Sequence, residues 1–75
     1  MKKQTLELSV RNKSGVLNRI TSIFRRFGLN ISSLTVTETE SPDLSTITVL
    51  FESDENGKHQ LVNQFYKLHD IISIN

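Results

Sequence analysis

The 75-residue sequence contains no cysteine, one proline and three glycines, and its net charge is only +1. Without cysteine there are no disulfides, no thiol nucleophile and no thiolate metal site. The three glycines are isolated from one another, so no glycine-rich loop is available to enclose a phosphate. The near-balanced charge gives no electrostatic case for binding nucleic acid or an anionic membrane.

Long apolar runs are also absent, and no segment approaches the length of a transmembrane helix. The N-terminus leads into an alternating pattern rather than into the apolar core of a signal peptide, which predicts a cytoplasmic location. The length allows a single domain, residues 1–75. So short a chain is often marginally stable alone, and we therefore expect it to form oligomers.

The longest amphipathic segment follows a first strand. Residues 5–11 alternate between apolar and polar side chains, as in a half-buried strand. After the turn Asn12–Gly15, apolar residues recur at helical spacing, which predicts a helix with one buried face. Gly28 is suited to the position after this helix, since glycine readily adopts the left-handed conformation. The residues expected on the buried face are Val16, Leu17, Ile20, Ile23, Phe24 and Phe27.

Two further strands are predicted in the middle of the chain, over residues 30–40 and 44–52. In the first of them Ile31 is out of step with Leu34 and Val36, which indicates a bulge at Ser32–Ser33. Polar turn residues separate the two strands. The second strand alternates again, and its expected core residues are Ile47, Val49 and Phe51.

A second helix and a last strand complete the pattern. Residues 53–57 are polar and can cap a helix whose buried stripe is Leu61, Phe65 and Leu68, and residues 70–74 form a short strand. The order βαββαβ predicts a ferredoxin-like α+β sandwich, with a four-stranded antiparallel sheet and two helices on one face. The second strand would then be an open edge, where two chains could pair side by side.

The residues give little support for catalysis, and no catalytic or metal-binding residue is predicted. No Gly-x-Ser-x-Gly motif occurs, and His59 and His69 are expected to be a solvated helix residue and a local capping residue. Glu38 and Glu40 alone make a weak metal-binding pair. RNA-binding modules of this fold carry paired aromatics on the third strand, where this chain has only the inward-facing Phe51.

The remaining candidate for a binding site is the turn Asn12–Gly15 together with Asn30. Unpaired N–H groups at a helix start attract anions, so those of Gly15 and Val16 could hold a carboxylate. Side-chain amides both donate and accept hydrogen bonds, which suits the ammonium or the carboxylate of an amino acid. The candidate ligand-binding residues are Asn12, Ser14, Gly15, Val16, Leu17, Asn30 and Ile31. Of these, Val16, Leu17 and Ile31 could form an apolar wall.

A purely structural role explains the polar members of this set equally well. Asn12 and Ser14 suit a turn and a helix cap, and Asn30 suits a turn after Gly28. Caps and anion sites use the same backbone groups, so the residues alone leave both interpretations open.

Two motifs in the first half of the chain give a resemblance to a known family. They are Asn12-x-Ser14-Gly15-Val16-Leu17-x-Arg19-Ile20 and Phe24-x-x-x-Gly28-x-Asn30-Ile31-x-Ser33-Leu34-Thr35-Val36. The chain resembles the ACT domain of acetolactate synthase (acetohydroxyacid synthase) small subunits, and the likeness continues to Lys67-Leu68-x-Asp70-Ile71. The stretch from Gly28 to Leu34 is specific to these small subunits, whereas a glycine in the first turn is common to ACT domains.

The resemblance implies a non-catalytic regulatory subunit in the biosynthesis of valine, leucine and isoleucine. The chain itself would carry no cofactor, and thiamine diphosphate, magnesium and FAD would be on the catalytic partner subunit. In such subunits ACT domains form a homodimer edge to edge, and valine binds at the interface as a feedback inhibitor. On matching positions the valine contacts would be Asn12, Gly15 and Asn30, with Val16, Leu17 and Ile31 nearby.

Two departures from the family pattern bear on this expectation. Many members carry a second domain after the ACT domain, and a form with one domain could activate the enzyme without sensing valine. Lys13 places a positive charge in the turn where an acid is common, which could alter the ligand preference. Two alternatives stay open: an amino-acid-binding ACT module that regulates another enzyme, and a protein-interaction domain without a ligand.

Overall fold

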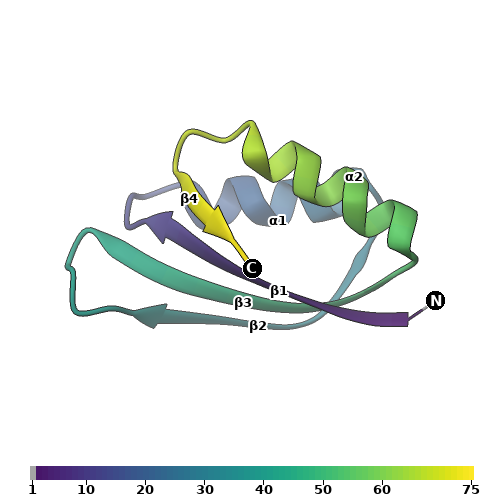
Figure 1. Ribbon diagram of the computed structural model, residues 1–75, viewed down its shortest axis with the longest axis horizontal. Coiled ribbons are helices and arrows are strands. Elements are labelled where there is room, and N and C mark those ends of the chain that lie inside the picture. Colours follow the sequence, from purple (N-terminus) through teal and green to yellow (C-terminus); the bar gives the residue numbers. More distant parts are fainter. Residues whose placement is uncertain (1) are drawn as a thin grey trace.

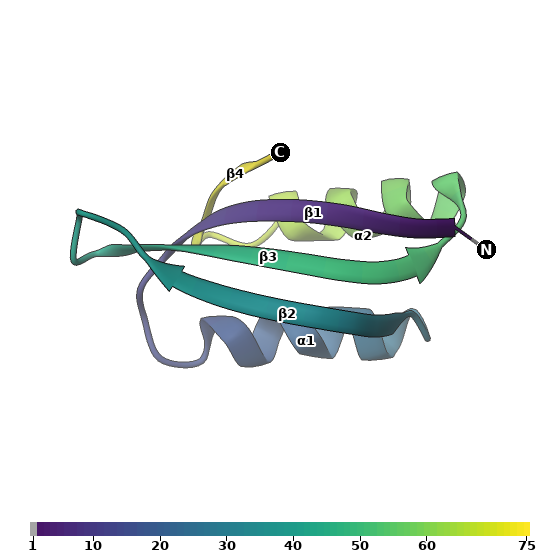
Figure 2. The same cartoon turned by 90° about the horizontal axis from the view of Figure 1, so that it is seen from below.

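Two helices cover one face of a four-stranded antiparallel sheet in the computed structural model, which describes residues 2–75 (Figure 1). The strand order is β2-β3-β1-β4, so β2 and β4 are the edges of the sheet (Figure 2). The predicted ferredoxin-like fold is confirmed. In chain order the elements are β1 (Lys2–Arg11), α1 (Val16–Arg26), β2 (Asn30–Glu38), β3 (Leu44–Ser53), α2 (Glu55–Tyr66) and β4 (Ile71–Ile74).

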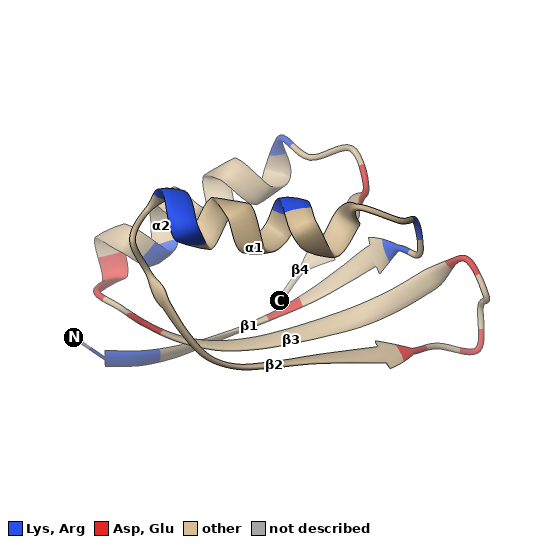
Figure 3. Ribbon diagram, turned by 180° about the vertical axis from the view of Figure 1, so that it is seen from behind, with Lys and Arg blue, Asp and Glu red and all other residues tan. Residues whose placement is uncertain are grey.

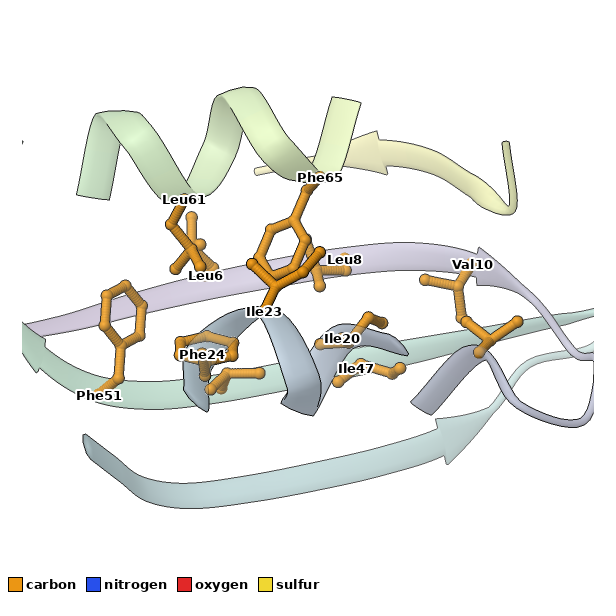
Figure 4. Close-up of a cluster of buried hydrophobic side chains, with 12 residues drawn as sticks. Leu6, Leu8, Val10, Ile20, Ile23, Phe24, Ile47, Phe51, Leu61 and Phe65 are labelled. Atoms are coloured by element: carbon orange, nitrogen blue, oxygen red, sulfur yellow. The ribbon is translucent and has the colours of Figure 1, made fainter. Parts of the chain in front are cut away.

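The core lies between the sheet and the two helices and is centred on three phenylalanines (Figure 4). Phe24 of α1 meets Phe51 of β3 edge to face, with ring centroids 5.1 Å apart, and it meets Phe65 of α2 at 5.7 Å. All three are at most 1% exposed. Such aromatic pairs add stability beyond the burial of their area, so this contact fixes both helices on the sheet.

Left-handed glycines mark both ends of α1. Gly15 precedes the helix with φ +88°, and Gly28 follows it with φ +67°. At the C-terminal end the Gly28 N–H donates to the Arg25 carbonyl and the Leu29 N–H donates to the Phe24 carbonyl, each over 3.0 Å. These two bonds form a Schellman motif, which ends the helix as the sequence predicts.

Helix α2 begins with a side-chain cap, as the polar residues 53–57 predict. The Asp54 carboxylate accepts a hydrogen bond of 2.7 Å from the Gly57 N–H, which satisfies one of the unpaired donors of the first turn. Among residues 2–75 no helix is both long enough and apolar enough to cross a membrane.

The predicted bulge in β2 is present, between Ile31 and Ser33. One extra residue at this point restores the register, so that Leu34 lies opposite Val49 and Val36 lies opposite Ile47. Without it the side chains that follow would be turned to the other face of the sheet. The bulge therefore keeps the apolar residues of the edge strand on the helix side.

Two apolar residues depart from the predicted buried stripes. Leu17 is 40% exposed, although its spacing places it with the core residues of α1. It lies on the side of the helix that faces the open β2 edge, where no further element of the described chain covers it. Leu68 was expected within the second helix, but α2 ends at Tyr66 and Leu68 packs half-buried from the following turn.

The central aromatic contact makes a testable prediction. Replacing Phe24 by alanine removes a fully buried ring and should lower the free energy of unfolding by about 3–5 kcal/mol. Phe27→Ala is the matched control, because Phe27 is only half-buried against the same core and should cost less. Urea denaturation at constant protein concentration measures both losses. Equal losses would show that the three-ring contact is not the centre of the core.

Candidate functional site

The start of α1 has no acidic residue in its first turn, and no side chain among residues 2–75 caps it. The first helical bond runs from the Arg19 N–H to the Gly15 carbonyl, over 3.0 Å. Within residues 2–75 the N–H groups of Gly15 and Leu17 have no hydrogen-bond partner. The Val16 N–H, expected as a carboxylate donor, has only a long bond of 3.4 Å to the Lys13 carbonyl. This helix start therefore presents free donors at the positive end of the dipole.

Asn12 holds the turn against the loop between β2 and β3. Its N–H donates to the Asp43 carbonyl over 2.7 Å, and its side-chain Nδ2 donates to the Pro42 carbonyl over 3.3 Å. The structural role proposed for Asn12 is therefore real, and its Oδ1 is left without a hydrogen bond among the described residues. Ser14 does not cap the helix, because the N-cap position belongs to Gly15.

A cavity of about 200 Å³ opens beside this turn. Its apolar wall includes Leu17 and Val36, which are 40% and 48% exposed and lie on neighbouring elements. Its full lining is Val10, Arg11, Asn12, Lys13, Val16, Leu17, Val36, Ser45 and Ile47. A small concave surface with aliphatic walls and a few polar groups suits a small aliphatic ligand.

Asn30 and Ile31 lie at the opposite end of α1. They line a separate, shallow hollow that also includes Thr21, Phe24, Arg25, Gly28 and Leu29. The eleven-residue helix, about 16 Å long, runs between the turn Asn12–Gly15 and Asn30. A single chain therefore brings Asn12, Ser14, Gly15, Val16 and Leu17 together but does not bring Asn30 and Ile31 to them.

The turn is also tied to the segment just before β4 through Asp70, which the sequence did not single out as a site residue. The Asp70 carboxylate accepts a 3.2 Å bond from Arg19 and lies 3.9 Å from the Lys13 ammonium. Its backbone carbonyl accepts a 2.8 Å bond from the Arg11 N–H. The unusual charge of Lys13 is thus partly balanced by an acid that sits only 11% exposed beside the turn.

Val36 lines the cavity, although the sequence did not identify it as a site residue. Its alternation with Leu34 predicts the correct face, but nothing in the pattern shows that the strand is covered at Leu34 and open at Val36. Elsewhere on the described chain, residues 2–75, no group of three or more His, Cys, Asp or Glu is placed to hold a metal ion. His59 and His69 are both exposed.

Comparison with known proteins gives the same family as the sequence motifs described above. The family described as "AHAS small subunit-like ACT domain" matches residues 6–73. A probable acetolactate synthase small subunit of Archaeoglobus fulgidus is 44% identical over 72 residues, which cover 96% of this chain and 45% of the relative. The acetolactate synthase small subunit of Bacillus subtilis is 42% identical over 73 residues, or 96% and 42% of the two chains.

Solved structures support the same assignment. The acetolactate synthase small subunit of Thermotoga maritima superposes with a TM-score of 0.88 at 33% identity, over 100% of this chain and 47% of that chain. The ACT domain of GTP pyrophosphokinase from Chlorobium tepidum reaches 0.79 at 16% identity over 97% and 94%, a likeness of fold alone. This chain spans less than half the length of the small subunits that it matches.

The glycine at the helix start can be tested directly. A Cβ on Gly15 would meet nothing within 4 Å, so any loss on replacement comes from the left-handed backbone alone. Gly15→Ala should therefore lower the free energy of unfolding by about 1–2 kcal/mol. Ser14→Ala, at an exposed position that is not a cap, should stay within about 0.5 kcal/mol. A larger loss at Ser14 in thermal or urea unfolding would contradict this description of the turn.

Proposed function

Because the chain belongs to the family of AHAS small subunit-like ACT domains, we propose that it is the ACT domain of a regulatory, non-catalytic subunit of acetolactate synthase. Its partner is then the catalytic subunit, which would carry the thiamine diphosphate, magnesium and FAD expected from the resemblance. The relatives' names as small subunits support this assignment. The cytoplasmic location stays a prediction from the sequence.

The open β2 edge is the surface through which two copies would pair. Among residues 2–75, β2 has β3 as its only neighbour in the sheet, so one row of its backbone N–H and C=O groups is free to bond another strand. A closed pair of identical chains is most simply related by a two-fold axis, which would set β2 antiparallel to β2 of the partner copy. The result would be a continuous sheet of eight strands.

This pairing would complete the ligand site. α1 packs along the β2 side of the sheet, with its start near the end of β2 and its end near the start of β2 (Figure 2). Asn30 is the first residue of β2. The two-fold axis would place the start of one α1 opposite the end of the other. The Gly15 turn of one chain would then face Asn30 of the other. The separation of the two half-sites within one chain thus supports a site shared by two chains.

Each part of an amino acid would have a partner in such a site. The carboxylate would bind at the free N–H groups of Gly15 and Leu17, where the helix dipole favours an anion. The ammonium would bond to the amide oxygens of Asn12 and of the other chain's Asn30. A small aliphatic side chain would lie against Leu17 and Val36, so valine or a related amino acid fits best.

The observation that carries this proposal is the uncapped helix start beside an apolar cavity at an open sheet edge. Regulation would follow from differential affinity. A ligand shared by two chains favours the arrangement in which both half-sites meet, and it biases an enzyme that responds to that arrangement.

Valine should therefore stabilise the protein against heat. At a valine concentration about 100 times Kd the stabilisation is about 2.7 kcal/mol, which raises Tm by several degrees for a domain of this size. Aspartate should give no such shift, because its second carboxylate would lose its hydration against aliphatic walls. Differential scanning fluorimetry at fixed protein concentration measures both ligands.

Asn30→Ala should abolish the valine shift without unfolding the domain, since Asn30 is exposed in the single chain. Asn63→Ala, at an exposed position of α2, is the matched control and should keep the full shift. A shift that survives Asn30→Ala would contradict the proposed contacts. If no branched-chain amino acid shifts Tm, the sensing function falls and a ligand-free interaction domain becomes the better interpretation.

A further inference from the structure

Helix α1 carries three arginines and no acidic residue (Figure 3). Arg25 and Arg26 lie in the last turn, where a cation also complements the helix dipole. Arg19 lies nearer the start, where the dipole gives no such benefit, and it is held by Asp70 at 3.2 Å. Among residues 2–75, Asp70 is the only acid that forms an ion pair with an arginine of α1.

Two of these arginines border a groove on the α2 side of α1. The groove has a volume of about 360 Å³ and is lined by Asn18, Arg19, Ser22, Ile23, Arg26 and Leu68. Ile23 and Leu68 are its recessed apolar members, and the other four supply polar or cationic groups. No acidic side chain of the described part of the chain lines it. We call this surface the arginine groove.

The arginine groove lies on the side of α1 away from the proposed pairing edge. Thr21 and Arg25 line the hollow next to Asn30, and Leu17 lines the cavity next to the Gly15 turn. Ser22 and Arg26 come one residue later in each case and are therefore turned by about 100° toward α2. Pairing through β2 would leave the groove open.

We infer that the arginine groove binds an acidic segment of the catalytic subunit, a claim that rests on the proposed function. An apolar side chain of that segment would enter between Ile23 and Leu68, and a flanking carboxylate would bond to Arg26. Arginine binds carboxylates with two parallel hydrogen bonds, and an apolar anchor ringed by polar contacts is the usual centre of a protein interface. A nucleic acid is the poorer fit, because the whole chain has a net charge of only +1.

The test titrates the chain into the purified catalytic subunit of acetolactate synthase from the same organism, at low and at high salt. Arg26→Glu reverses one charge at the groove and should weaken binding about tenfold or more, with most of the loss visible at low salt. Lys58→Glu is the matched control, because it makes the same change of charge on α2 outside the groove. Its binding should stay within about twofold of the unchanged chain.

A second variant tests the groove without changing its charge. Ser22→Trp should fill the groove and weaken binding to a similar extent without changing any charge. Melting curves establish that each variant is folded before it is titrated.

Three outcomes would overturn the inference. If the unchanged chain does not bind the catalytic subunit, both the proposed function and the groove assignment fall. If it binds and Arg26→Glu and Ser22→Trp bind equally well, the groove assignment alone falls. If Arg26→Glu and Lys58→Glu weaken binding equally while Ser22→Trp binds normally, the attraction is a general charge effect and the groove is not the contact.

Discussion

The packing of Phe24 between Phe51 and Phe65 is the interaction on which the rest of the structure depends. It fixes the position of α1 over the sheet, and left-handed glycines set where the helix begins and ends. A helix held in this way can leave its first N–H groups unpaired, because the core and not the cap supplies its stability. The free donors of the candidate site therefore follow from the core.

The open edge of the sheet leaves an exposed aliphatic surface beside this helix start. Leu17 and Val36 are exposed because the sheet ends at β2. One exposed aliphatic side chain is common on a protein surface, but two that lie next to each other indicate a contact surface. A second copy of the chain would cover both. The two sides of α1 would then bind different partners. The side toward β2 would bind the ligand and the second copy, and the side toward α2 carries the arginine groove.

Much of the fold could be predicted from the sequence because periodicity reports which face of an element is buried. The strict alternation around Leu8 and Val49 and the out-of-step Ile31 were sufficient for the strands and the bulge. Periodicity does not report what lies above a face, so the exposure of Leu17 and the end of α2 before Leu68 were missed. The family motif contains both Asn12 and Asn30, and the predicted helix lies between them, but the pattern does not show that they line separate hollows.

A site shared by two chains is tested most directly by mixing two defective variants. Asn12→Ala and Asn30→Ala should each abolish valine binding alone, measured by isothermal titration calorimetry. In a mixed pair one site would carry both substitutions and the other neither, so an equimolar mixture that exchanges subunits should regain about one intact site in four. A mixture that binds no valine, although each variant is folded and paired, would contradict a site built from two chains.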